Sequence, residues 1–329
     1  MKIVVDAMGG DHAPKNVIAG VVEAVKELPV TVTLVGIEDR VKAELSKHSY
    51  PKQQIEIIHA PEVVEMDDNP LDVLRKKKDC SMAVGVKLLK QPGYDAFVSA
   101  GNTGALVAAA TFYLRMIEGF DRPGIGLLIP QIDGCAFLID IGANPDPKPE
   151  HIYHYGHMAR EYMRAVMGKD NPTVGLINIG EEEGKGSGSD KQNYQLLQEK
   201  MPGFIGNIEP NQLFKSKADC IVCSGVVGNV IIKLSEGLME AAGTVLKREI
   251  KKNPLAMLGA LMMLGSLKDL KKNVDYSEYG GAPLLGVNGI VMKSHGRSSP
   301  KAIKNAIHAT VREVEHKIID RMRAAVVTT

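Results

Sequence analysis

The sequence predicts an α/β fold built on a largely parallel β-sheet, and three observations predict it. Short apolar, β-branched runs alternate with longer segments of helical periodicity along nearly the whole chain, which is typical of βαβ units. Several of these runs end in a glycine-rich turn that leads into a helical segment. Hydrophobic residues make up 44% of the 329 residues, which is enough for a sizeable core.

The elements follow one another without an internal repeat, a low-complexity linker or a domain boundary, so we expect one domain over residues 1–329. The expected strands are Ile3–Asp6, Val30–Gly36, Ile55–His59, Ala96–Ser99, Gly126–Ile129, Ala136–Ile141, Thr173–Ile177, Phe204–Gly206 and Cys220–Cys223. The expected helices are Val17–Leu28, Ser81–Lys90, His151–Met167, Lys191–Lys200, Val230–Lys251 and Pro300–Ala325. Ligands of open parallel sheets sit beyond the carboxyl ends of the strands, which is where we expect the chemistry.

The overall charge and the first residues narrow the class of protein. The formal net charge is +1, which argues against a dedicated nucleic-acid-binding protein because such proteins usually carry a basic excess. Residues 1–6 read directly as a strand rather than as a basic and then apolar leader, so we expect a cytoplasmic protein. Gly, Pro or Lys interrupts the longest apolar stretches, so no transmembrane helix is expected.

The four cysteines do not indicate a metal centre. Cys220 and Cys223 form one Cys-x-x-Cys pair, but Cys80 and Cys135 provide no second pair with a spacing typical of zinc. Thiols of a cytosolic chain are expected to be reduced, and the residues between Cys220 and Cys223 look like strand residues in a core. We therefore expect neither a metal nor another cofactor.

The turn at Ser99–Ala105 joins an expected strand to an expected helix. Gly101 and Gly104 permit close backbone approach, and free N–H groups at a helix start attract anions. Asn102 and Thr103 add side-chain donors. We interpret this turn as a seat for phosphate or for a developing oxyanion; a tight turn with a capped helix start is the alternative.

Four further glycine-rich turns gather ionisable or amide side chains at expected strand ends, at residues 6–15, 140–151, 178–188 and 224–233. For the first three, the alternatives are a capped turn with solvated charges, a rigid proline-rich connector and a disordered surface loop. Late loops at residues 276–282 and 293–299 add donors. The chain has no P-loop, because Gly186 follows Lys185, and it lacks the dinucleotide fingerprint and the serine nucleophile elbow.

Residues 254–267 are apolar nearly all round and are flanked by lysines and an arginine. The segment is too short to span a bilayer, but it is suited to contact a membrane interface or a partner surface or to bind an apolar ligand. A buried core or dimer contact is the alternative. We expect residues 237–275 to form a protruding helical segment, a dimer or membrane tip whose contact residues are Leu255, Leu258, Leu261 and Met262.

Several motifs, in order and nearly from end to end, resemble those of the bacterial acyl-acyl-carrier-protein:phosphate acyltransferases, the PlsX family of phospholipid synthesis. They are Asp-Ala-Met-Gly-Gly-Asp at 6–11, Ser-Ala-Gly-Asn-Thr-Gly-Ala at 99–105, Asp-Arg-Pro at 121–123, Gly-Ala-Asn at 142–144, Lys-Pro-Glu-His at 148–151, Asn-Ile-Gly-Glu-Glu at 178–182, Gly-Asn at 228–229 and Tyr-Gly-Gly-Ala at 279–282. The combination is far more specific than any single motif.

The resemblance implies that long-chain acyl-acyl-carrier-protein and inorganic phosphate are converted to acyl phosphate and free carrier protein, for phosphatidic acid and phospholipid synthesis. It also implies a homodimer with a three-layer, Rossmann-like α/β fold, similar to phosphotransacetylases and isopropylmalate-type dehydrogenases. A helical tip would associate peripherally with the inner face of the membrane, where a downstream membrane acyltransferase is a further expected partner.

Two stretches depart from the pattern of that family. Ser224-Gly225-Val226-Val227-Gly228-Asn229 stands where the family usually has Asp-Gly-Phe-Thr-Gly-Asn, so an acid and an aromatic residue are missing. Pro145-Asp146-Pro147 stands where Val-Asp-Ala is common. The first departure removes any role for an acid at position 224 and is expected to lower activity.

The reaction sets three tasks: holding the phosphate, stabilising the tetrahedral oxyanion and releasing a thiolate. The candidate catalytic residues are His151, Lys185 and Asn229. The candidate phosphate- or substrate-binding residues are Asp6, Gly9, Gly10, Asp11, Ser99, Gly101, Asn102, Thr103, Asn144, Lys148, Gly228 and Lys233. His151 would manage a proton or bind phosphate, the lysines would clamp phosphate, and Asn102 and Asn229 would polarise the carbonyl.

Two other functions remain compatible with the sequence. One is a short-chain phosphotransacylase that uses coenzyme A, although the apolar segment at 254–267 favours a long acyl chain or a membrane. The other is a non-catalytic acyl sensor or membrane scaffold, which the missing acid at Ser224 makes conceivable.

Overall fold

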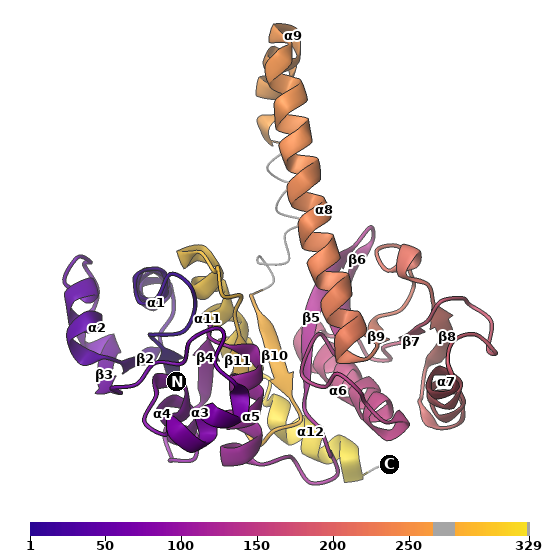
Figure 1. The fold of residues 1–329 in the computed structure, drawn as a ribbon, viewed down its shortest axis with the longest axis horizontal. Helices are drawn as coiled ribbons and strands as arrows, with labels where there is room; N and C mark the ends of the chain where they lie inside the picture. The colour runs from indigo at the N-terminus through magenta and orange to yellow at the C-terminus, as the bar shows by residue number, and fades with distance from the viewer. Residues whose placement is uncertain (266–279, 328–329) are drawn as a thin grey trace.

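The computed structural model describes residues 1–265 and 280–327, and its centre is an eleven-stranded sheet (Figure 1). Across the sheet the order is β3 (Ile55–His59), β2 (Thr31–Gly36), β1 (Lys2–Asp6), β4 (Ala96–Ser99), β11 (Ile290–Lys293), β10 (Ala282–Leu285), β5 (Gly124–Gln131), β6 (Gly134–Ile139), β9 (Cys220–Val222), β7 (Val174–Ile177) and β8 (Phe204–Ile208). The outer neighbours pair in parallel, whereas β10 and β5 pair antiparallel with their neighbours. The predicted α/β fold with a mostly parallel sheet is confirmed.

Helices cover both faces of this sheet. They are α1 (Lys15–Glu27), α2 (Glu38–Leu45), α3 (Pro70–Lys76), α4 (Ser81–Leu88), α5 (Thr103–Leu114), α6 (Pro149–Met167), α7 (Gly188–Lys200), α8 (Gly225–Lys252), α9 (Pro254–Met262), α11 (Pro300–Glu315) and α12 (Ile318–Val327). On one face α1 packs against α11 and α6 against α12. On the other face α4 and α5 bury their apolar sides.

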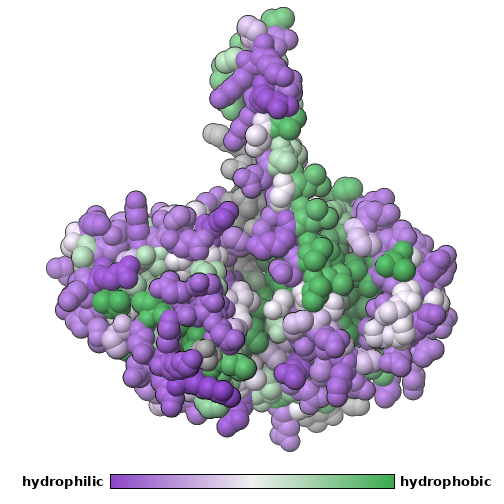
Figure 2. All heavy atoms as spheres, in the orientation of Figure 1, coloured by the Kyte–Doolittle hydropathy of each residue, from purple (hydrophilic) through white to green (hydrophobic). Residues whose placement is uncertain are grey.

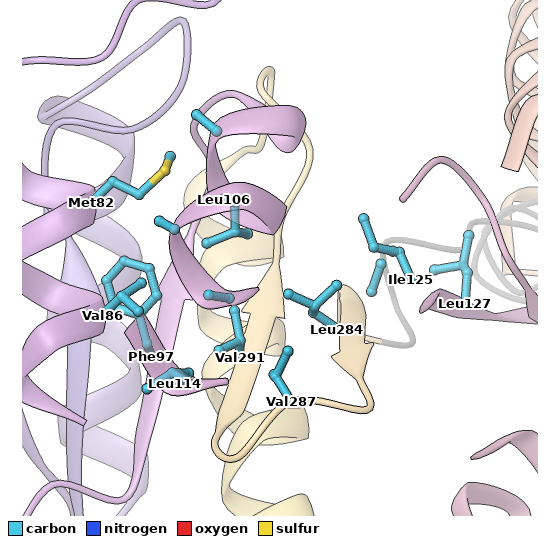
Figure 3. Packing of buried hydrophobic residues seen from close by; sticks show 14 of the residues in the cluster. Met82, Val86, Phe97, Leu106, Leu114, Ile125, Leu127, Leu284, Val287 and Val291 are labelled. Carbon is cyan, nitrogen blue, oxygen red and sulfur yellow. The ribbon is translucent and has the colours of Figure 1, made fainter. Parts of the chain in front are cut away.

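One buried cluster ties the two halves of the sheet together. Its side chains include Phe97 on β4, Val291 on β11, Leu284 on β10 and Ile125 on β5, and they follow one another across the middle of the sheet (Figure 3). The β10–β11 hairpin therefore lies between β4 and β5, and it brings strand ends of the two halves to one central region.

The helices α2 and α3 and the strands β10 and β11 were not among the expected elements, and α11 and α12 were expected as one helix. The two strands have four residues each, and β10 contains Pro283, which weakens the strand pattern. The break between α11 and α12 falls at Lys317, whose φ of 52° is left-handed. That conformation ends a right-handed helix although the hydrophobic periodicity continues.

The 28-residue helix α8 starts at the sheet and then projects far from it, with α9 near its outer end (Figure 1). A rise of 1.5 Å per residue makes α8 about 42 Å long. Its buried residues are the two glycines of its first turn, Gly225 and Gly228, and beyond Glu236 nearly every residue is exposed. No helix in the described ranges is long and apolar enough to cross a membrane. Residues 266–275 of the expected tip lie outside the described residues.

Candidate active site

Three adjacent parallel strands, β1, β4 and β11, end side by side with polar residues. The register places Lys293 of β11 opposite Ser99 of β4, and Asp6 follows the β1 residue that lies opposite Val98. The Ser99 hydroxyl donates to Asp6 Oδ2 over 2.7 Å, and the Met8 N–H donates to Asp6 Oδ1 over 3.1 Å. Burial raises the pKa of the Asp6 carboxyl group, and these donors act against that rise because they stabilise the carboxylate.

The glycine turns after β1 and β4 pack directly against each other. A Cβ on Gly9 would lie 2.6 Å from Asp6 Oδ2 and 2.7 Å from the Gly101 nitrogen, which no side chain tolerates. Gly10 has a φ of +99°, a conformation that favours glycine. The predicted residues Asp6, Gly9, Gly10, Ser99 and Gly101 therefore form one unit whose backbone is fixed by close contact.

Asn102 holds a neighbouring loop at the start of α5. Its Oδ1 accepts the Ala105 N–H over 3.0 Å as a helix cap. Its amide group donates to the carbonyl oxygens of Met66 and Asp68 over 2.9 and 3.1 Å. Both amide hydrogens thus bond to the loop at residues 66–68, and the expected role of Asn102 as an oxyanion donor stays a prediction.

A second buried aspartate organises the turn after β6. The carboxylate of Asp140 accepts N–H groups from Ile125, Gly142, Ala143 and Asn144 over 2.7–3.1 Å. The carbonyl oxygen of Asn144 in turn accepts the Gly225 N–H over 3.0 Å. The turn at residues 140–144 is therefore docked onto the beginning of α8.

Ser224 caps α8, because its hydroxyl accepts the Val227 N–H over 3.3 Å. Aspartate and serine are both preferred caps, so the role that the structure gives position 224 does not require the missing acid. We expect Ser224→Ala to lower the free energy of unfolding by about 1 kcal/mol and Ser224→Asp to leave it nearly unchanged. Urea denaturation measures both, and equal stability of the two variants would contradict the assignment.

A cavity of about 150 Å³ lies between the two halves of the sheet. Its apolar lining comes from Ile125, Leu127, Ile141, Ile232, Ala282 and Ala302. Its polar lining comes from Thr103, Asn229, Lys233, Glu236, Lys293, Ser294, His295 and Ser298. The structure thus brings together Thr103, Asn229 and Lys233 of the predicted residues, from α5 and α8.

Lys233 and Lys293 are the two lysines of this cavity. The Lys233 Nζ lies 3.1 Å from Glu236 Oε2 and 3.2 Å from His295 Nε2. Lys293 is only 8% exposed, and its Nζ donates to the Ser294 carbonyl oxygen. Lys293 and His295 were expected only as donors in a late loop. The apolar run Ile290–Met292 is the signal that could have indicated a strand with Lys293 at its carboxyl end.

His151 lines a second cleft of about 510 Å³, together with Asp121, Arg122, Lys148 and Glu150. Its Nδ1 accepts the Lys148 N–H over 3.0 Å and lies 3.4 Å from Asn144 Nδ2. Burial, followed by the nearby Arg122, lowers the pKa of His151, so the neutral ring is favoured. Asn144 links this cleft to the start of α8 and hence to the first cavity.

Lys185 and Asp11 lie away from the lining of both spaces. Lys185 follows β7, lies 3.8 Å from Glu182 and lines neither the cavity nor the cleft. The Asp11 N–H donates to the Gly296 carbonyl oxygen over 2.9 Å, and its carboxylate faces Arg297 at 3.7 Å. The roles of both residues stay predictions. The expected core cysteines Cys220 and Cys223 are indeed buried.

The model of a family described as fatty acid synthesis protein matches residues 1–321. The chain belongs to this family. The phosphate acyltransferase of Alkaliphilus oremlandii (strain OhILAs) is 44% identical over 326 residues, which cover 99% of this chain and 97% of that protein. The phosphate acyltransferase of Geobacter sp. (strain M21) is 48% identical over 307 residues, which cover 93% and 87%.

Solved structures confirm the fold expected for a member of the fatty acid synthesis protein family. A phosphotransacetylase from Streptococcus pyogenes superimposes with a TM-score of 0.66 at 16% identity, covering 96% of this chain and 94% of that one. A 4-hydroxythreonine-4-phosphate dehydrogenase from Klebsiella pneumoniae gives 0.56 at 14% identity, covering 95% and 99%. The predicted likeness to phosphotransacetylases is therefore correct.

Proposed function

We propose that this protein transfers a long-chain acyl group from acyl-acyl-carrier-protein to inorganic phosphate and releases acyl phosphate and free carrier protein. The cavity between the two half-sheets carries the proposal, because an apolar wall faces Lys233 and Asn229 there. The names of the relatives, phosphate acyltransferase, support the same chemistry. Acyl phosphate would feed phosphatidic acid and phospholipid synthesis.

Phosphate is itself a nucleophile, so the protein has only to hold it in line and stabilise the charge that develops. One phosphate oxygen attacks the thioester carbonyl carbon, the C–S bond breaks, and the proton of hydrogen phosphate neutralises the departing thiolate. In this mechanism Lys233 binds phosphate and Asn229 donates to the carbonyl oxygen that becomes the oxyanion. Neutral His151, in the neighbouring cleft, would bind a substrate group or relay the proton.

Purified protein, palmitoyl-acyl-carrier-protein and radiolabelled phosphate test the activity directly. We expect labelled acyl phosphate, separated from the unreacted labelled phosphate by extraction, and an equal amount of free carrier protein. Transfer from acyl-coenzyme A alone would favour the short-chain phosphotransacylase. No transfer from either donor would favour the acyl sensor or scaffold.

His151→Ala and Lys185→Ala test the roles of those two residues. Unchanged acyl-phosphate formation in one of the variants removes that residue from the mechanism.

We also place the protein in the cytoplasm, at the inner face of the membrane, with α9 as the contact. Leu255, Leu258, Leu261 and Met262 are 57–83% exposed there, and Figure 2 shows hydrophobic atoms on this outer end. Lys251 and Lys252 end α8 beside them. Exposed apolar side chains beside basic ones suit binding to an anionic bilayer surface. A downstream membrane acyltransferase would receive the acyl phosphate there.

Reversing the charge of Lys251 and Lys252 should weaken membrane binding. Each lysine near an anionic surface contributes about 1 kcal/mol, so we expect the vesicle affinity of the double Glu variant to fall at least about tenfold. Sedimentation with anionic vesicles measures this, and Lys26→Glu on α1 is the control. Unchanged binding would favour a dimer contact for this tip.

The base of α8 suits the expected homodimer. Val227, Val230, Leu234 and Leu238 are exposed and spaced three or four residues apart, so they share one helix face. Figure 2 shows hydrophobic atoms along α8 where it leaves the sheet. A second copy that packs its own α8 on this face would bury both stripes, and Leu234→Glu should then yield monomers in sedimentation equilibrium.

A further inference from the structure

Lys293 lies in an unusual place for a lysine. It is 8% exposed, it lines the cavity, and the register of β11 fixes its backbone between β4 and β10. Its Nζ donates to the Ser294 carbonyl oxygen. Within the described ranges no carboxylate forms an ion pair with it, so a buried cation lacks the partner that such groups usually have.

The charges around the cavity make it a better phosphate site than the second cleft. In the cavity lining, Lys233 is paired with Glu236 at 3.1 Å, and the lining has no further carboxylate for Lys293. In the cleft, Arg122 and Lys148 are matched by Asp121 and Glu150, so the formal charges cancel. An anion therefore gains more electrostatic stabilisation in the cavity than in the cleft.

We propose that Lys293 binds the attacking phosphate together with Lys233. Above neutral pH, the amine of Lys293 takes up a proton from the solvent when phosphate binds. The inference deepens the proposed function, since it names the residue that holds the acyl acceptor. In the empty cavity burial lowers the pKa of Lys293 to about 8, with Lys233 acting in the same direction. A phosphate dianion beside the amine favours its charged form and reverses this shift.

Other charged groups face Lys293 from the elements around it. Asp6 on β1 and Asp11 in the following turn raise the pKa of Lys293 but do not offset the burial. Glu236 is engaged with Lys233, and burial lowers the pKa of His295, so its ring is favoured neutral. Loss of the proton of Lys293 above about pH 8 is thus the change that bound phosphate would reverse.

A purely structural role for Lys293 predicts a different result from a binding role. If the lysine only holds the Ser294 carbonyl oxygen, Lys293→Met loses that bond and destabilises the protein. If it is kept for binding, removing an unpaired buried charge leaves the protein equally stable or more stable. Thermal unfolding without phosphate, compared with Lys26→Met on the exposed surface of α1, distinguishes the two.

Titration of the full-length protein with inorganic phosphate, followed by ³¹P NMR, tests the proposal. For the natural protein we expect the affinity to fall about fivefold between about pH 8 and pH 9, because a proton must be bound with the ligand. Lys293→Met should bind at least about tenfold more weakly at neutral pH and show no such dependence. Lys293→Arg should keep the affinity and lose the pH dependence, since arginine stays charged.

Unchanged phosphate affinity and an unchanged pH profile in Lys293→Met would overturn the proposal. So would loss of phosphate binding in Lys148→Met with normal binding in Lys293→Met, because phosphate would then occupy the second cleft. Phosphate binding of the expected kind in a protein that forms no acyl phosphate would refute the proposed function and leave this inference intact.

Discussion

Replacing Gly228 with alanine is expected to disrupt the protein, although alanine is the better helix former. A Cβ at this position would lie 2.0 Å from the carbonyl oxygen of Asp140 and 3.0 Å from the Cα of Ile141. Both are backbone atoms, and the turn that holds them is fixed by the N–H groups that surround the Asp140 carboxylate. The start of α8 must therefore move away, and Asn229 and Lys233 move with it. We expect a loss of several kcal/mol in the free energy of unfolding and no measurable acyl-phosphate formation.

Gly237 provides the matched control within the same helix. A Cβ there meets nothing within 4 Å, so Gly237→Ala should stabilise the protein by up to about 1 kcal/mol. If the packing of Gly228 against Asp140 fixes the site, urea denaturation will show a lower free energy of unfolding for Gly228→Ala and a higher one for Gly237→Ala. Similar stabilities would show that the α8 contact with the turn at residues 140–144 is not important.

Replacing Asn229 with alanine is expected to abolish most activity without unfolding the protein. The side chain lines the cavity and makes no hydrogen bond to the described residues, so its removal should change the free energy of unfolding by less than about 0.5 kcal/mol. Loss of one oxyanion donor lowers kcat by about 10²–10³. We expect the KM for phosphate to change little, because Asn229 acts on the carbonyl rather than on phosphate.

Steady-state acyl-phosphate formation at varied phosphate concentration measures this split between kcat and KM. Asn211→Ala, in the turn at Pro210–Gln212 away from the cavity lining, is the control and should retain full activity. A rise in the KM for phosphate with an unchanged kcat would instead make Asn229 a phosphate-binding residue.

The sequence was sufficient for the parallel outer parts of the sheet but not for its centre. Runs such as Ile3–Asp6 and Ala96–Ser99 are apolar and end at a glycine turn, so their period and their boundaries agree. The strands β10 and β11 are four residues long and follow the segment 266–279. Their pairing depends on contacts with β4 and β5, which lie far away in the sequence, and local patterns carry no information on such contacts.

The same reason explains which site residues were found. Asp6 and Ser99 were recognised as members of two separate turns. The parallel register of β1 and β4 brings the Ser99 hydroxyl within 2.7 Å of Asp6 Oδ2. Lys293 was not selected, because only its burial beside the cavity distinguishes it from other lysines. Asn102 was expected to face a ligand, but the loop at residues 66–68 takes its amide hydrogens. In each case, contacts with residues far away in the sequence determine whether the side chain belongs to the site, and residue type alone does not.

The position of β11 has a consequence for how the chain is made. Because β11 inserts between β4 and β10, the ribosome must synthesise nearly the whole polypeptide before β4 gains its second neighbour. Until then the inner edges of β4 and β5 are open, and open strand edges pair readily with other chains. The nascent protein is therefore most vulnerable to aggregation late in translation, and chaperones that shield strand edges would have their greatest effect at that stage.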